Sequence, residues 1–252
     1  MCCCSQPRGV RRRRHEDSCR HGNAANLNPK SRRSAFTVEV DCRLARTITT
    51  DVNIGVLASH EGTTLQSVLD ACAEGRIAGR VTLVMSNNSG SGALHRARQA
   101  GVSVAHLSST THPHPGALDL AIRNALRSAA VDLVLLAGYM KTLGPTTIEA
   151  FKGRVLNTHP ALLPKFGGQG MYGDHVFAAV IEAGESESGV SIHIVDGGVD
   201  TGRVVRQCKV PVLPADSIET LKARIRMRER EFVVQTLADI SQGVLALDNA
   251  DS

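Results

Sequence analysis

The chain has 252 residues, of which 42% are hydrophobic and 3% aromatic, and its formal net charge is +5. No apolar run reaches the ~20 residues that cross a bilayer, so the sequence predicts a soluble protein without a membrane partner. The charge is unevenly distributed: residues 1–50 contain 11 Lys/Arg and 4 Asp/Glu (net +7), and residues 51–252 contain 18 and 20 (net −2). The basic excess lies outside the body of the chain, and we therefore expect no nucleic-acid partner for that body.

Five of the seven cysteines also lie in residues 1–50, and only Cys72 and Cys208 lie beyond them. An odd total with two cysteines in the body does not fit a disulfide framework. The sequence therefore predicts a reducing compartment, the cytoplasm.

Residues 1–50 contain no apolar segment of the kind found in secretory signals and no helical or strand periodicity. A disordered basic extension, an organelle transit peptide and upstream sequence translated from a misplaced start are all open, although Glu16 and Asp17 argue against a transit peptide. The possible metal ligands here match no standard zinc spacing; they are Cys2, Cys3, Cys4, His15, Cys19 and His21. We expect a disordered extension at 1–50 and one domain at 51–252, with an organelle as the alternative location.

From Val52, apolar runs alternate with amphipathic segments. Strands are expected at 52–58, 80–86, 102–107, 131–138 and 153–157, and helices at 63–75, 92–101, 117–130 and briefly after Pro145. Runs that are apolar throughout are typical of parallel strands buried on both faces. Their alternation with helices of about ten residues predicts right-handed crossovers.

The remaining third of the chain has a different pattern. A loop with the glycine-rich stretch KFGGQGMYG (165–173) precedes a helix expected at 174–184. The runs 189–196 and 203–212 predict an antiparallel hairpin, and 217–241 a terminal helix. The fold class is therefore α/β: a mostly parallel twisted sheet with helices on both faces, Rossmann-like in its N-terminal half, and antiparallel strands added at the C-terminal part. Such sheets bind ligands at the carboxyl ends of the strands, where the strand order reverses.

The stretch ASHEGTTLQ (58–66) marks the first turn from strand to helix. Gly62 permits a tight turn, and the N–H groups of Thr63, Thr64 and Leu65, together with the helix dipole, suit a phosphate group. This is neither a P-loop nor G-x-G-x-x-G, so an ordinary turn with a threonine cap is the alternative.

The stretch NTHPALLP (157–164) places Asn157 and His159 on the same side of an extended segment. A carboxamide donates to a carbonyl oxygen, and an imidazole donates or exchanges a proton, so the pair suits an oxyanion site that also moves protons. The alternative is an asparagine that caps a turn and a histidine bonded to the backbone.

The stretch GVSIHIVDGGVDTG (189–202) supplies Asp196 and Asp200 on a glycine-rich loop. A carboxylate near His159 would favour the imidazolium and relay protons through water, whereas aspartates in tight turns are often Asx-turns. His193 alternates with Ile192 and Ile194; it either faces the same crevice or is a buried, hydrogen-bonded histidine.

Together these motifs resemble the phosphoribosylglycinamide formyltransferases (glycinamide ribonucleotide transformylases), a folate-dependent formyltransferase family, from about residue 52 to residue 247. The likeness rests on N-x-H-P-x-L-L-P at 157–164 and G-x-S-I-x-x-V-x(4)-D-x-G at 189–202. It implies the formyltransferase fold and transfer of the formyl group of 10-formyltetrahydrofolate, a co-substrate, to 5-phosphoribosylglycinamide in de novo purine biosynthesis. It implies small-molecule substrates, no metal, and a monomer or homodimer.

The resemblance also implies roles for particular residues. The family's catalytic residues fall on Asn157, His159 and Asp200. The resemblance assigns phosphate binding to Gly62, Thr63 and Thr64, and ribose binding to Glu229. It assigns folate binding to Met140, Lys141, Thr142 and Leu143, to Asn157, and to Val195, Asp196 and Val199 of the following loop.

Some positions depart from the family pattern. The phosphate turn, usually G-x-G-S-N-L-Q, is interrupted here by His60, Glu61 and Thr64, and Glu61 would repel a phosphate unless it points away. In the family an arginine contacts the folate tail, but residues 111–119 contain no arginine. Lys141 replaces another common arginine. The terminal helix reads REREFVV where the family more often has E-H-x-x-Y-P. Another formyltetrahydrofolate-dependent transferase or hydrolase, or a non-catalytic binder of folate or nucleotide, are the alternatives.

We predict that deletion of residues 1–50 leaves formyl transfer unchanged, because all three motifs lie beyond them. Steady-state rates of the full and shortened chains test this. A shortened chain that folds but has lost activity would contradict a disordered extension.

Overall fold

The computed structural model describes residues 51–247. The expectations for residues 1–50, including disorder and the possible zinc ligands, lie outside the described residues.

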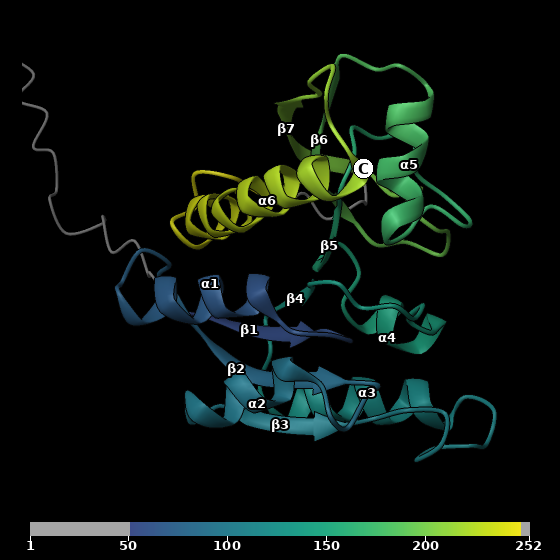
Figure 1. The fold of residues 1–252 in the computed structure, drawn as a ribbon. Coiled ribbons are helices and arrows are strands. Elements are labelled where there is room, and N and C mark those ends of the chain that lie inside the picture. Colours follow the sequence, from purple (N-terminus) through teal and green to yellow (C-terminus); the bar gives the residue numbers. More distant parts are fainter. Residues whose placement is uncertain (1–50, 248–252) are drawn as a thin grey trace, which may run out of the picture. The chain divides into compact units, whose positions relative to one another are not determined.

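One seven-stranded sheet forms the centre of this part of the chain (Figure 1), in the order β3-β2-β1-β4-β5-β6-β7. The strands are β1 (Val52–Leu57), β2 (Gly79–Ser86), β3 (Ser103–His106), β4 (Leu133–Leu136), β5 (Val155–His159), β6 (Glu187–Ile194) and β7 (Val204–Pro211). The first five strands pair in parallel, whereas β6 runs antiparallel to β5 and β7 antiparallel to β6. The predicted α/β class, with antiparallel strands added at the C-terminal part, is confirmed.

Helices cover both faces of the sheet. They are α1 (Thr63–Ala73), α2 (Gly92–Gln99), α3 (Ala117–Ser128), α4 (Pro145–Ala150), α5 (Asp174–Glu182) and α6 (Ile218–Ser241). Side chains alternate along β1, so Val56 belongs to the apolar cluster that contains residues of α1, α2, α5 and α6, and Leu57 to the cluster that contains residues of α3 and α4. Two apolar layers therefore enclose strands buried on both faces, as the continuous apolar runs predicted.

The strand order reverses between β1 and β4, which are neighbours in the sheet. The turn after β1, residues 137–144 after β4, and the end of β5 therefore lie beside one another at the carboxyl edge of three adjacent parallel strands. All three segments carry residues that the sequence singled out. The edge is the ligand-binding position of an open α/β sheet.

A buried carboxylate joins α3 to α4 and so fixes the segment that follows β4. Asp119 accepts hydrogen bonds from the backbone N–H groups of Thr146 (2.7 Å) and Thr147 (2.9 Å), and from the Thr147 hydroxyl (2.5 Å). It thereby caps α4 from another element. Gly144 is required beside it, because a Cβ there would overlap the Asp119 carboxyl group.

We predict that Asp119→Ala lowers the free energy of unfolding by about 2 kcal/mol, because two backbone N–H groups lose their acceptor, whereas the Thr147 hydroxyl keeps the Asp119 carbonyl. Asp119→Asn should cost less, since the amide oxygen still accepts. Urea unfolding measures both, with Asp70→Ala on the exposed side of α1 as the control. Equal effects of Asp119→Ala and Asp70→Ala would contradict this role.

Candidate active site

The end of β5 presents two functional side chains to one face of the sheet. Asn157 pairs across the sheet with His193, and His159 with Ser191. Residues two apart on a strand, and residues opposite each other on neighbouring strands, share a face. The antiparallel strand β6 therefore brings Ser191 and His193 beside Asn157 and His159.

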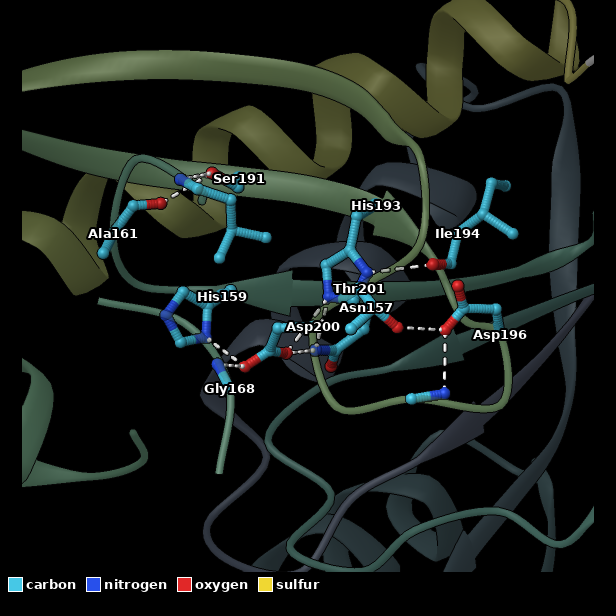
Figure 2. A network of polar contacts seen from close by, with 12 residues as sticks. Asn157, His159, Ala161, Gly168, Ser191, His193, Ile194, Asp196, Asp200 and Thr201 are labelled. Carbon is cyan, nitrogen blue, oxygen red and sulfur yellow. Dashed lines mark hydrogen bonds and ion pairs between the residues drawn. The ribbon is translucent and has the colours of Figure 1, made fainter. Parts of the chain in front are cut away.

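Asp200 completes this cluster from the loop between β6 and β7 (Figure 2). Its Oδ2 lies 3.3 Å from His159 Nδ1, and its Oδ1 lies 3.3 Å from His193 Nε2. Asn157 Nδ2 lies 3.4 Å from Asp200 Oδ1. The three residues taken from separate motifs thus converge, with Asp200 held at a left-handed φ of 55°.

His193 satisfies both interpretations that the sequence left open. Its side chain is buried, and its Nδ1 lies 2.9 Å from the Ile194 carbonyl oxygen. A carbonyl only accepts, so Nδ1 carries a proton, and Nε2 lies 3.0 Å from Asn157 Nδ2 and 3.3 Å from Asp200 Oδ1. His193 therefore orients the Asn157 carboxamide. Its alternation with two isoleucines was the only sequence signal.

The ring of His159 lies between two acceptors. Its Nε2 donates to the Phe166 carbonyl oxygen at 2.7 Å, and its Nδ1 faces Asp200. Only the imidazolium satisfies both, yet the ring is 4% exposed. Burial lowers the pKa of His159, and Asp200 and the Phe166 carbonyl oppose this only in part. The sequence expectation that Asp200 would favour the imidazolium has the right sign, but desolvation outweighs it.

Asp200 stays ionised inside this cluster. Burial by itself would raise its pKa, but the hydrogen bond from His193, the charge of His159 and the Gly168 N–H together hold the pKa of Asp200 below its usual range. The Gly168 N–H donates to Oδ2 at 3.1 Å. A carboxylate beside a histidine of lowered pKa is suited to proton transfer.

The turn after His159 is fastened to β6 and β7. The Ser191 hydroxyl donates to the Ala161 carbonyl at 2.6 Å and accepts from the Leu163 N–H at 3.0 Å (Figure 2). Gln207 Nε2 donates to Ser191 Oγ at 2.8 Å and to the Leu163 carbonyl at 2.9 Å. Ser191 was part of the sequence motif without an assigned role, and here it holds the NTHPALLP turn.

The turn after β1 leaves the start of α1 open. Gly62 is the N-cap residue with φ 68° and no side-chain cap, and the first N–H bonded within the helix is that of Gln66, to the Gly62 carbonyl. The threonine cap considered from the sequence is therefore not formed. Thr63 is exposed and Thr64 buried, so the backbone N–H groups of this first turn are the donors available to an anion.

Glu61 is directed toward the neighbouring helix. A Cβ built on Gly92, the first residue of α2, would lie 2.8 Å from Glu61 Oε2. A helix N-terminus attracts a carboxylate. Arg96 also donates to the Glu61 carbonyl at 2.8 Å. The carboxylate that would repel a phosphate at α1 is thereby placed at α2.

Glu229 of α6 lies on the other side of β5. The Thr158 hydroxyl donates to Glu229 Oε1 at 2.5 Å, and Thr158 points away from the side of Asn157 and His159 because side chains alternate. Burial raises the pKa of Glu229. Glu229, the residue expected to bind the ribose, is thus bonded to β5, the strand that carries Asn157 and His159.

The segments expected to hold folate differ in what they expose. Met140 is 39% and Val199 38% exposed, whereas Leu143 is 7% exposed and packs in the core, so only its backbone can face a ligand. The Met140 N–H donates to the Ser59 hydroxyl at 2.8 Å. Asp196 accepts from the Gly198 N–H and the Thr201 hydroxyl, an arrangement that shapes its own loop.

Within residues 51–247, no three His, Cys, Asp or Glu side chains are grouped to hold a metal ion. In the same range no helix is both long and apolar enough to cross a membrane.

The sequence model of the formyl transferase family matches residues 52–237, which include every residue of this cluster. The chain belongs to the formyl transferase family. It is 41% identical over 194 residues to phosphoribosylglycinamide formyltransferase of Haemophilus influenzae, covering 77% of this chain and 89% of that protein. It is 36% identical over 190 residues to the chloroplastic phosphoribosylglycinamide formyltransferase of Arabidopsis thaliana, covering 75% of this chain and 65% of that protein.

Among solved structures, glycinamide ribonucleotide transformylase 1 from Symbiobacterium toebii is similar, with a TM-score of 0.73 and 39% sequence identity. The alignment covers 79% of this chain and 91% of that one. The mixed sheet of this formyl transferase is therefore the fold of its relatives.

The burial of His159 predicts a pH dependence of stability. Its folded-state pKa lies below the ordinary value of about 6.5, so the unfolded chain binds the proton first as the pH falls. This contribution to the free energy of unfolding is present above about pH 6.5 and is lost as the pH falls from there toward the folded-state pKa.

His159→Gln should remove that part of the pH dependence. Urea unfolding of the wild type and the variant between about pH 8 and pH 5 measures the difference, with the exposed His95→Gln as the control. Parallel curves for the wild type and His159→Gln would contradict the burial of a neutral ring.

Proposed function

We propose that this protein transfers the formyl group of 10-formyltetrahydrofolate to the amine of 5-phosphoribosylglycinamide in de novo purine biosynthesis. The observation that carries the proposal is the convergence of Asn157, His159 and Asp200 at the carboxyl end of β5. The chain belongs to the formyl transferase family, and relatives at about 40% identity over most of its length bear the name of this activity.

The acceptor amine attacks the formyl carbon, and negative charge develops on the formyl oxygen. Asn157 is a donor for that oxygen, and His159 becomes a second donor through Nδ1 once that nitrogen has taken up a proton. Asn157 Nδ2 lies 3.0 Å from His193 Nε2 and 3.4 Å from Asp200 Oδ1. The longer contact is the one that can be exchanged for the substrate oxygen as charge builds up.

Proton transfer is assigned to His159 and Asp200. The attacking amine loses a proton, and the departing N10 of the folate gains one. The two residues take up the first proton and return it to N10, directly or through a water molecule. The lowered pKa of His159 suits this step, because a ring that is neutral near pH 7 accepts a proton and releases it readily.

The two substrates are assigned to opposite sides of this cluster. The phosphate is placed at the N–H groups of Gly62, Thr63 and Thr64, supported by the open start of α1, and the ribose at Glu229. The folate is placed along 140–143 and the loop 195–199. The exposed Met140 and Val199 supply apolar surface there for a flat ring system, with Lys141 and Thr142 exposed beside them.

We further propose that the protein is cytoplasmic, that it acts on small molecules alone, and that it is a monomer or a homodimer. A relative from a plant is named as chloroplastic, so an organelle is the alternative location.

We predict that His159→Ala lowers kcat by about 10²- to 10⁴-fold and that Asp200→Asn lowers it at least about 10²-fold, with KM little changed. Both groups act on charge that develops in the transition state. Asp70→Asn on the exposed side of α1 is the control. A rise in KM with an unchanged kcat would contradict the catalytic assignment.

Formyl transfer is followed by folate absorbance with and without 5-phosphoribosylglycinamide. Turnover only with the acceptor is expected. Hydrolysis without the acceptor would indicate a deformylating enzyme, and folate binding without any turnover would indicate a binding protein.

A further inference from the structure

The glycine-rich stretch that follows the NTHPALLP turn contacts both halves of the histidine–aspartate pair. We propose that residues 166–168 form a backbone clip that positions His159 and Asp200 for formyl transfer. The Phe166 carbonyl accepts from His159 Nε2 at 2.7 Å, and the Gly168 N–H donates to Asp200 Oδ2 at 3.1 Å. This inference rests on the proposed function.

The two ends of the clip act on one contact. Asp200 Oδ2, which accepts from Gly168, is the same oxygen that lies 3.3 Å from His159 Nδ1. Two hydrogen bonds and the contact between the imidazole and the carboxylate therefore connect Phe166 to Gly168 through His159 and Asp200 (the aspartate side is drawn in Figure 2). A shift of either peptide group would change the distance between the imidazole and the carboxylate.

The clip also determines which nitrogen of His159 exchanges protons. Because a carbonyl oxygen only accepts, the proton on Nε2 is held by Phe166. Nδ1, beside Asp200, is left as the nitrogen that gains or loses a proton. A histidine without this partner would divide its proton between the two nitrogens.

The backbone of the clip requires its unusual sequence. Phe166 adopts φ 56° and Gly168 φ 91°, both in the left-handed region. At Gly167 a Cβ would overlap Leu163 Cδ2 and approach Asp200 Cβ to 3.4 Å. A non-glycine residue at positive φ is unfavourable and persists only where the surroundings hold it.

The surroundings do hold this segment. Leu163, three residues before Phe166, is bonded through its N–H to Ser191 and through its carbonyl to Gln207. The clip is thus attached at one end to β6 and β7 and at the other to the catalytic pair. This explains why glycines at 167 and 168 follow a motif that itself carries the histidine.

Two glycines of the same loop provide a matched test. Gly168 has φ 91° and Gly170 φ 88°, and a Cβ on either would meet nothing within 4 Å. Alanine should therefore impose similar backbone strain at both positions, but only Gly168 bonds to Asp200. Gly168→Ala is expected to lower kcat by about tenfold to hundredfold with KM within about twofold, and Gly170→Ala to leave both within about twofold of the wild type.

The pH profile separates positioning from general loss of structure. Alanine keeps the backbone N–H of residue 168, but strain at φ 91° shifts that N–H away from Asp200 and weakens one of the bonds that hold the Asp200 pKa down. The titration of the Asp200 carboxyl group should therefore move to higher pH in Gly168→Ala and stay in place in Gly170→Ala. Equal kinetics and profiles of the two variants would overturn the clip.

A second measurement does not depend on turnover. Nitrogen-15 spectra of the histidine rings in the wild-type chain are expected to show His159 with its proton on Nε2, and the Nδ1–H form would overturn the clip even in an active enzyme. If the wild type folds, shows the Nε2–H form and transfers no formyl group, the proposed function fails while the clip geometry stands. The wild-type spectra also keep the test decisive if Gly168→Ala does not fold.

Discussion

A buried carboxylate between two buried imidazoles is the constraint on which the rest of the site depends. Asp200 lies 3.3 Å from a nitrogen of each histidine. A charge removed from water is tolerated only where hydrogen bonds and partner charges replace the solvent. The Gly168 N–H and the Asn157 amide donate to this carboxylate, and the two buried rings lie against it. The turn fastened by Ser191 helps to hold these groups in place, and with them the ionised carboxylate on which the proposed proton transfer relies.

The mixed topology of the sheet positions the two proposed sites, one for the phosphate and one for catalysis, in different ways. The parallel half ends at a reversal of strand order, where the open start of α1 offers N–H groups to a phosphate. The antiparallel addition turns β6 back along β5 and so brings His193 and the Asp200 loop to Asn157 and His159. A purely parallel sheet would place a following loop on the same edge but would not pair a second histidine with Asn157.

The departures from the family pattern have local physical reasons. Glu61 occupies the turn beside the proposed phosphate position, yet its carboxylate lies at the start of α2, where the helix dipole favours it. Arg96 binds the carbonyl of the same residue. The glycines after Lys165 allow backbone groups to approach the histidine–aspartate pair closely. Neither feature disturbs the arrangement of Asn157, His159 and Asp200.

The sequence by itself determined the elements of the sheet, because apolar periodicity reports burial directly, and it brought Asn157, His159 and Asp200 together through their motifs. The sequence also made His193 a candidate, but it could not show which way the side chain points, since alternation with isoleucines fits a core residue equally well. Only the tertiary structure decided the direction of the His159 pKa, because desolvation depends on the surrounding chain and outweighs the nearby carboxylate. The roles of the Phe166 carbonyl and the Gly168 N–H could also be assigned only from the tertiary structure. Every residue carries such backbone groups, so no residue type signals which of them will meet a catalytic side chain.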